Sequence, residues 1–303
     1  MTGATGLIGS ALVPLLLERG DAVTVLSRDA ARAKAKLGGG VEAVTADLET
    51  PGAWSAALAG AGAVVHLAGE SVAGKRWDAR QKQIIRDSRV EATRTLVEEI
   101  AKLTAADRPG VLISASGVDF YPFALPGEFD DDEVTERDPV GDSFLARVCR
   151  DWEREAVEAT QAGLRVAMMR IGLVLAKDGA LAKMSTAFKW FVGGKLGNGK
   201  QWVPWIHLDD AAAAFATAVH DERYRGPINL VTDSVRNREL SAAIGRALGR
   251  PSLVPVPGFA LKLAVGELAP YLLEGRRVVP KRLRELGFTW KHPELAEAVS
   301  AAI

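Results

Sequence analysis

The sequence lacks the features that would place it in several common classes of protein. Its 303 residues include one cysteine, Cys149, which excludes an internal disulfide framework and suits a reducing compartment such as the cytoplasm. The 38 basic and 38 acidic side chains cancel, so neither nucleic acid nor an anionic membrane is an expected partner. No apolar run reaches the roughly 18 residues of a membrane-spanning helix, and no signal peptide is visible. No spacing of His, Cys and carboxylate residues suits a metal site.

The chain opens on a glycine-rich loop, Thr2-Gly3-Ala4-Thr5-Gly6-Leu7-Ile8-Gly9. Glycine at every third position allows a tight turn, lets a pyrophosphate approach the backbone, and lets the next helix pack closely. The helix expected from about Leu7 to Arg19 would aim free N–H groups and its positive dipole end at that phosphate. The residues expected to bind a dinucleotide here are Gly3, Thr5, Gly6, Leu7, Ile8 and Gly9.

No strand precedes this loop, although a loop of this kind should follow a buried strand. One interpretation is that the loop is only a glycine-rich connection before a helix. The other is that the recorded sequence begins a few residues late, and the intact strand that follows the helix, at 22–26, favours it. Otherwise residues 1–3 alone would have to fill a central gap in the sheet.

The end of the strand at 22–26 bears on the choice of dinucleotide. An NAD-binding fold usually carries an acidic residue here for the ribose 2′-hydroxyl. Ser27 and Arg28 follow instead, and a hydroxyl and a guanidinium suit a 2′-phosphate. Asp29 is adjacent, but its place before Ala30 is typical of a helix N-cap. The sequence therefore favours NADP over NAD, against the simpler interpretation of Arg28 as a surface residue.

Strand-like and helix-like segments alternate along the chain, which predicts a doubly wound parallel sheet of Rossmann type. The expected strands are 22–26, 41–45, 63–69, 111–116, 166–170, 202–207 and 228–231. The expected helices are 7–19, 54–58, 78–103, 144–161, the apolar part of 180–199, 209–220, 238–248 and further helix up to residue 303. We predict an NADP-binding domain at 1–235, with a substrate-side insert at about 176–205, and a smaller helical C-terminal domain at 236–303.

Motifs along nearly the whole chain match one family in order. They are TGATGLIG at 2–9, VLSR at 25–28, HLAGE at 66–70, SASGVDFY at 114–121, FLARVCRDWE at 144–153, RIGLVL at 170–175 and GGKLGNGKQWVPWIHLDD at 193–210. The set resembles the extended short-chain dehydrogenase/reductase superfamily, in its atypical, NAD(P)-dependent epimerase/dehydratase-like branch with a C-terminal domain of unknown function. The resemblance implies an NADP-binding oxidoreductase or epimerase with a small-molecule substrate, such as a sugar nucleotide or a carbonyl compound.

The superfamily works with a Ser, a Tyr and a Lys, and this chain departs from that set. Ser116 matches the Ser, but Phe144 and Val148 stand at the Tyr and Lys positions and can neither transfer a proton nor carry charge. We predict Ser116 and Tyr121 as the catalytic residues, although a Tyr at a strand end is more often a packing residue. Asp119 is a second candidate base, with loop capping as its simpler interpretation.

Further cofactor contacts are expected where later strands end. The predicted residues are Asp47, Leu48, Leu67, Ala68, Gly69, Glu70, Arg76 and Ser114. Glu70 lies where the nicotinamide half would pass, and both a functional contact and structural pairing with Lys75 or Arg76 are open for it. Because Phe144 and Val148 cannot act, an NADP-binding sensor or scaffold without turnover is the alternative function. A monomer and a homodimer are both open.

Overall fold

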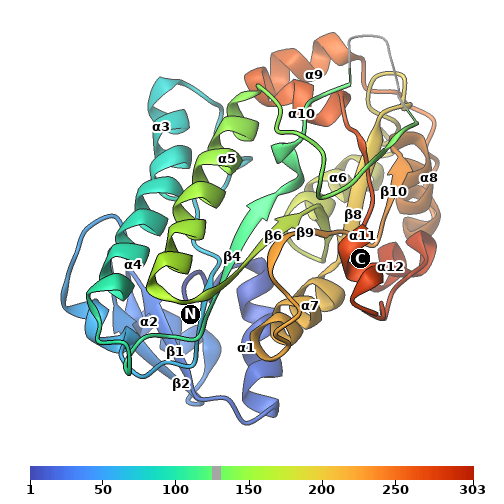
Figure 1. Ribbon diagram of the computed structural model, residues 1–303. Coiled ribbons are helices and arrows are strands. Elements are labelled where there is room, and N and C mark those ends of the chain that lie inside the picture. The colour runs from blue at the N-terminus through green and yellow to red at the C-terminus, as the bar shows by residue number, and fades with distance from the viewer. Residues whose placement is uncertain (125–130) are drawn as a thin grey trace.

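A parallel sheet covered by helices on both faces forms the centre of the computed structural model, which describes residues 1–124 and 131–303 (Figure 1). Its strands are, in spatial order, β3 (Ala63–His66), β4 (Val111–Gly117), β6 (Arg165–Ile171) and β9 (Gly226–Leu230). A parallel pair, β1 (Val23–Ser27) and β2 (Val41–Thr45), lies beside them. The Rossmann-type α/β fold predicted from the sequence is confirmed.

Thr2 joins the two groups of strands. It forms parallel bridges with Leu26 of β1 and His66 of β3, and its N–H donates to the carbonyl of Val65 over 2.9 Å. The carbonyl of Met1 accepts the N–H of Leu26 over 2.8 Å. Residues 1 and 2 thus occupy the position between β1 and β3 where a strand was expected. Beyond Met1 the same slot continues as a cavity of 580 Å³ lined by both strands.

The central strands are buried under helices on both faces, and most of their side chains are apolar. Leu112 in β4 packs into one cluster with α4 (Val90–Lys102) and α5 (Phe144–Val157). Its neighbour Ile113 points to the opposite face and packs with α1 (Leu7–Glu18) and α7 (Leu208–His220). Side chains that alternate between two buried faces leave a strand no exposed position, which is the signature of a parallel sheet.

The helix predicted over 78–103 is wrong in one respect, because two helices occupy this range. α3 spans Ala79–Asp87, α4 begins at Val90, and the chain turns at Ser88 and Arg89. The Ser88 hydroxyl donates to the Ile85 carbonyl and accepts the N–H of Glu70, so it joins the end of α3 to the segment after β3. Periodicity alone does not detect this break, because the apolar positions continue on both sides of it.

A second, smaller sheet consists of β7 (Leu173–Leu175), β8 (Trp202–His207) and β10 (Asp233–Arg236), in the order β10-β8-β7. A further short pair joins β5 (Glu133–Val134) to β11 (Arg277–Val278). The sequence predicted β8 but not the other strands of these sheets, which are two to four residues long. The remaining helices are α2 (Ala30–Leu37), η1 (Ala53–Leu58), η2 (Val118–Phe120), η3 (Glu158–Ala162), α6 (Ala180–Lys189), α8 (Asn237–Leu248), α9 (Gly258–Val265), η4 (Gly266–Leu268), α10 (Ala269–Leu273), α11 (Lys281–Glu285) and α12 (Leu295–Ala301). Across the described ranges, no helix has the length and apolar character needed to cross a bilayer.

One buried carboxylate on α7 holds the C-terminal segment of the chain in place. Asp210, at the start of α7, is 1% exposed and accepts the backbone N–H groups of Lys291 (2.6 Å) and His292 (3.0 Å). Two charge-assisted hydrogen bonds therefore hold the segment that leads into α12 against the helix that covers the sheet.

We expect Asp210→Ala to lower the free energy of unfolding by about 2–4 kcal/mol, because both N–H groups lose a charged acceptor. Asp209→Ala is the matched control: Asp209 is its neighbour, its side chain is 43% exposed, and its ion pair with Lys291 is a surface pair. That control should cost less than about 1 kcal/mol. Urea denaturation of both variants measures the difference, and equal losses would contradict this role for Asp210.

Candidate functional site

The glycine loop packs tightly against the end of β3. Gly3 has a φ of +65°, and a Cβ atom there would lie 2.5 Å from the carbonyl carbon of Leu67. A Cβ atom at Gly9 would lie 2.3 Å from the carbonyl oxygen of Gly3. Any side chain at either position would push the loop off the strand or off the helix. Two of the three predicted loop glycines are therefore required by close packing of the backbone.

The third glycine faces outward at the start of α1. Gly6 is exposed and is the N-cap residue, so no side chain caps the helix from that position. The first N–H groups of a helix have no partner inside the helix, and here they belong to Leu7, Ile8 and Gly9. Together with the helix dipole, they make this end of α1 a site for a phosphate or another anion.

Basic side chains flank one side of this loop. Arg28 follows β1, is exposed, and forms no ion pair with any carboxylate in the described ranges. Lys36, on α2, donates to the carbonyl of Thr5 over 2.8 Å. Asp29 accepts the N–H of Arg32, which confirms its predicted role as an N-cap. Lys36 was not predicted from the sequence, although a short helix after Arg28 can bring a basic side chain eight residues later back to the same loop.

The segment after β3 lies directly beside the loop. The N–H groups of Leu67 and Ala68 both lie 3.2 Å from Thr2 Oγ1. A Cβ atom at the next residue, Gly69, would lie 3.1 Å from the guanidinium carbon of Arg89. Arg89 therefore rests on the backbone at the end of β3. Its position comes from the helix break at residue 89, which is why the sequence analysis did not single it out.

Four other predicted cofactor residues are placed differently. The side chain of Asp47, after β2, accepts the N–H of Glu49, and Leu48 packs partly buried against the cluster under α4. The Ser114 hydroxyl is fully buried and donates to the carbonyl of Ala115. Arg76 donates to the carbonyl of Leu263 in α9 over 3.4 Å. Arg76 thus contacts the C-terminal region, and Ser114 has no exposed group to offer a ligand.

A buried ion pair lies below the end of β4. Arg170 in β6 donates to both carboxylate oxygens of Glu153 in α5, each over 2.8 Å. The Ser116 hydroxyl donates to the same carboxylate over 2.7 Å. Glu153 is 7% exposed, and Ser116 and Arg170 are each 3% exposed. The predicted catalytic serine therefore belongs to a closed polar network.

Tyr121 extends the same network. Its hydroxyl donates to Asn229 Oδ1 over 2.6 Å and lies 2.9 Å from Arg170 Nη1. Burial raises the pKa of Tyr121 to about 12, even though the neighbouring Arg170 opposes that rise. Asn229 in turn donates to the carbonyl of Val279. The structure brings Ser116 and Tyr121 together through Arg170 and Glu153; catalysis by these two residues stays a prediction.

Other ionisable groups gather at the open end of β4. A Cβ atom at Gly117 would lie 3.3 Å from Asp119 Oδ2 and 3.6 Å from Cys149 Sγ. Burial raises the pKa of Asp119 to about 6, and the charge of Arg89 works against that rise. Burial also raises the pKa of the Cys149 thiol to about 12. Glu70 interacts electrostatically with Arg89, and its contact with the cofactor stays a prediction.

An aromatic cluster surrounds the helix position that carries Phe144. The Trp77 ring lies 5.3 Å from that of Phe144 and 5.5 Å from that of Tyr271, which comes from α10. The N–H of Leu145 donates to the Tyr271 hydroxyl over 3.0 Å. The C-terminal region thus places a phenol at the start of α5, next to the strand ends described above.

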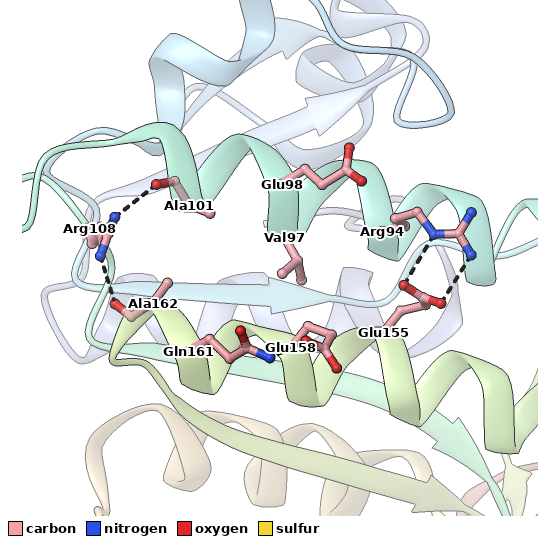
Figure 2. A pocket seen from close by; sticks show the side chains of 9 residues that line it. All are labelled: Arg94, Val97, Glu98, Ala101, Arg108, Glu155, Glu158, Gln161 and Ala162. Carbon is pink, nitrogen blue, oxygen red and sulfur yellow. Dashed lines mark hydrogen bonds and ion pairs between the residues drawn. The ribbon is translucent and has the colours of Figure 1, made fainter.

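A separate hollow lies between α4 and α5 (Figure 2). It has a volume of 420 Å³ and is bridged at one end by Arg94, which donates to both oxygens of Glu155. At its other end Arg108 donates to the carbonyls of Ala101 and Ala162. The hollow lies along these helices, whereas the glycine loop lies at the end of the sheet, so we do not assign it to the cofactor.

One group of possible metal ligands does come together among the described residues. Ligand atoms of His207, Asp209 and His292 all lie within 4.8 Å of one another. Sequence spacing could not show this, because His292 is distant in the chain. Lys291 already neutralises Asp209 over 2.6 Å, and His207 Nδ1 accepts the Asp209 N–H as the N-cap of α7. These contacts favour a structural role for the three side chains.

Comparison with known proteins gives two family matches, one after the other along the chain. Residues 1–230 match the NAD dependent epimerase/dehydratase family, and residues 256–302 match a domain of unknown function, DUF1731. An Arabidopsis thaliana protein described as "Epimerase family protein SDR39U1 homolog, chloroplastic" is 41% identical over 99% of this chain and 85% of its own length. A Bos taurus epimerase family protein, SDR39U1, is 36% identical over 99% of this chain and 98% of its own length.

Solved structures give the same result. The crystal structure of human epimerase family protein SDR39U1 (isoform 2) with NADPH is similar with a TM-score of 0.85 and 31% identity, over 99% of this chain and 97% of that one. A nucleoside-diphosphate sugar epimerase from Corynebacterium glutamicum is similar with a TM-score of 0.77 and 33% identity, over 99% of this chain and 57% of that one.

The close approach at Gly9 predicts a large effect of one methyl group. We expect Gly9→Ala to lower the free energy of unfolding by about 3 kcal/mol, because the new Cβ atom would collide with the Gly3 carbonyl. Gly39→Ala is the control, since a Cβ atom at Gly39 meets nothing within 4 Å. The control should stay within about 0.5 kcal/mol of the wild type in urea denaturation. Equal stabilities for both variants would contradict the packing described here.

The buried ion pair predicts that two variants of α5 differ in stability. We expect Glu153→Ala to cost about 3–5 kcal/mol of stability, because it leaves the Arg170 charge buried and unpaired. Glu155→Ala, two residues along the same helix, removes a partner from Arg94, whose side chain is 40% exposed, and should cost about 1 kcal/mol or less. Chemical denaturation monitored by circular dichroism compares the two. A small loss for Glu153→Ala would show that the network is not a main support of the sheet.

Proposed function

Since this chain belongs to the NAD dependent epimerase/dehydratase family, we propose that it binds NADP(H) and acts as an oxidoreductase or epimerase on a small molecule. One observation carries the proposal. The outward-facing Gly6 and the uncapped start of α1 form an anion site beside the strand ends of β3 and β4. In open α/β sheets, dinucleotides bind outside the carboxyl ends of the strands.

The residues present fit a dinucleotide both at its pyrophosphate and at its nicotinamide half. The N–H groups at the start of α1 would hold the pyrophosphate, and the backbone at Leu67 to Gly69 would face the nicotinamide half. A side chain at Gly3 or Gly9 would destroy the cradle, so these positions are suited to a close backbone approach. When bound, the cofactor supplies a hydride acceptor or donor, and the chain must supply orientation and proton transfer.

Arg28 and Lys36 support NADP rather than NAD. Both are cations beside the glycine loop, and a guanidinium matches the oxygens of a 2′-phosphate. The human relative was crystallised with NADPH, whereas more distant structures of the same fold contain NAD. We also propose that the protein works in the cytoplasm, where its one thiol, Cys149, stays reduced.

We propose that Ser116 and Tyr121 position the end of β4. Their hydroxyls already have partners inside the network of Glu153, Arg170 and Asn229. Since η2 follows β4 directly, the network fixes where Asp119 lies. The expectation that Ser116 and Tyr121 themselves transfer protons is kept as a prediction that the variants Ser116→Ala and Tyr121→Phe would test.

A sensor or scaffold that binds NADP without turnover is the second candidate function. Phe144 and Val148 favour it, because neither side chain can transfer a proton or carry charge. NADPH oxidation by the purified protein against a panel of carbonyl compounds and sugar nucleotides distinguishes the two. Turnover that is lost in a variant of the strand-end residues would exclude the sensor.

We expect Arg28→Ala to raise the Kd for NADPH about tenfold or more while leaving the Kd for NADH within twofold. The reason is that a hydrogen bond to a charged group contributes about 1.5–3 kcal/mol, and only NADPH carries the 2′-phosphate. Titration of the nucleotide fluorescence measures both constants. Arg225→Ala is the control, because Arg225 precedes β9 at the opposite edge of the sheet.

Two results would count against this proposal. If the wild-type protein binds neither nucleotide, the assignment of a cofactor site is contradicted. An equal loss of NADPH and NADH affinity in Arg28→Ala would retain the site but overturn the choice of NADP.

A further inference from the structure

The segments after β3 and β4, which face the proposed cofactor, carry a guanidinium and a carboxylate. Asp119 lies at the end of β4, against Gly117, and Arg89 lies at the end of β3, against Gly69. The two strands are neighbours in the sheet, with His66 opposite Ser114, and adjacent strands lie about 4.8 Å apart. The carboxylate and the guanidinium therefore face the same place outside the sheet.

Asp119 differs from the other ionisable groups near it in having no fixed partner for its carboxylate. In the described ranges no ion pair within 4.0 Å and no hydrogen bond from another residue to this carboxylate is found. By contrast, the hydroxyl groups of Ser116 and Tyr121 each donate a hydrogen bond to a partner inside the protein. Of the polar groups at the end of β4, Asp119 is the one left able to take up a proton.

Arg89 is held in place without a carboxylate of its own. Its Nη1 donates to the carbonyl of Ile85 over 3.1 Å, and its guanidinium lies 5.4 Å from the centre of the Trp152 ring. It interacts electrostatically with Cys149, Asp119 and Glu70. A fixed cation that no single anion neutralises can stabilise negative charge at the reacting atoms.

We propose that Asp119 is the catalytic proton acceptor of this protein and that Arg89 is the cation that stabilises it. The proposal rests on the proposed function, since it places Asp119 beside the nicotinamide. In the oxidative direction, the O–H bond of a secondary alcohol breaks and its proton bonds to the Asp119 carboxylate. The C–H bond breaks with its electron pair, the hydride leaves for NADP⁺, and the carbinol carbon becomes a carbonyl carbon. Reduction is the reverse.

The assignment fits the chemistry of the remaining groups. The pKa of Asp119, raised by burial to about 6, lies near physiological pH, where a group exchanges protons most effectively. Burial raises the pKa of Cys149 to about 12 and also raises that of Tyr271, so neither ionises between pH 5 and 8. Among the described residues, Glu70 is a second carboxylate that interacts electrostatically with Arg89.

The test compares how tightly the oxidised and reduced cofactors bind as the pH changes. The oxidised nicotinamide ring is positively charged and the reduced ring is neutral, so an ionised Asp119 beside it favours NADP⁺. We expect the ratio of Kd for NADP⁺ to Kd for NADPH to fall about tenfold between pH 5 and 8 in the wild type, with a midpoint near 6. The 2′-phosphate titrates in both nucleotides and cancels in the ratio.

Three variants make the outcome specific. In Asp119→Asn the ratio should not change with pH, whereas in Glu70→Gln its fall should persist whatever happens to the affinity itself. Arg89→Met should move the midpoint upward, because Arg89 lowers the pKa of Asp119. That shift would not follow from a merely structural role, and it tests the proposal even where Asp119→Asn fails to fold.

The measurements distinguish failure of the role of Asp119 from failure of the proposed function. Binding of both nucleotides with a ratio that does not depend on pH, or one whose dependence persists in Asp119→Asn, would overturn the role of Asp119 and leave the proposed function intact. Failure of the wild type to bind either nucleotide would overturn both.

Discussion

The buried ion pair between Glu153 and Arg170 is the constraint on which the carboxyl end of the sheet depends. It joins α5 to β6, receives the Ser116 hydroxyl from β4, and reaches β9 through Tyr121. A charged pair in the core is costly to desolvate, and it persists here because each charge has several hydrogen-bonding partners. The strand ends are thereby fixed relative to one another, and the loops that follow them inherit that geometry.

The usual pair of ionisable side chains is absent from α5, where Phe144 and Val148 stand at those positions. Phe144 packs in an aromatic cluster with Trp77 and Tyr271, and Val148 is buried. The charges stand instead on the segments that follow β3 and β4, where Arg89 and Asp119 rest against glycines. A parallel sheet offers such positions at every strand end, so chemistry can move between neighbouring segments while the scaffold stays unchanged.

The sequence was most informative where one local pattern decides the structure. The apolar strands, the helix after the glycine loop and the N-cap at Asp29 are all as expected. The break at Arg89 was missed, because it depends on a hydrogen bond between Ser88 and the distant Glu70. Likewise, no pattern indicates that Glu153 meets Arg170, since a helix and a strand must first pack before their faces are known.

The attachment of the C-terminal region has a consequence for how ligands enter and leave. α8 packs against α12, and Asp210 holds the segment before α12, so the stretch from α9 to α10 is anchored on both sides. Its contacts across the site include the exposed ion pair of Lys82 with Glu267 and the packing of Tyr271 against Trp77. Phe259 and Leu263 are already 77% and 75% exposed. An outward swing of this stretch to admit a ligand would have to break the contacts of Tyr271 with Trp77 and Leu145, so ligand entry is coupled to the packing at the start of α5.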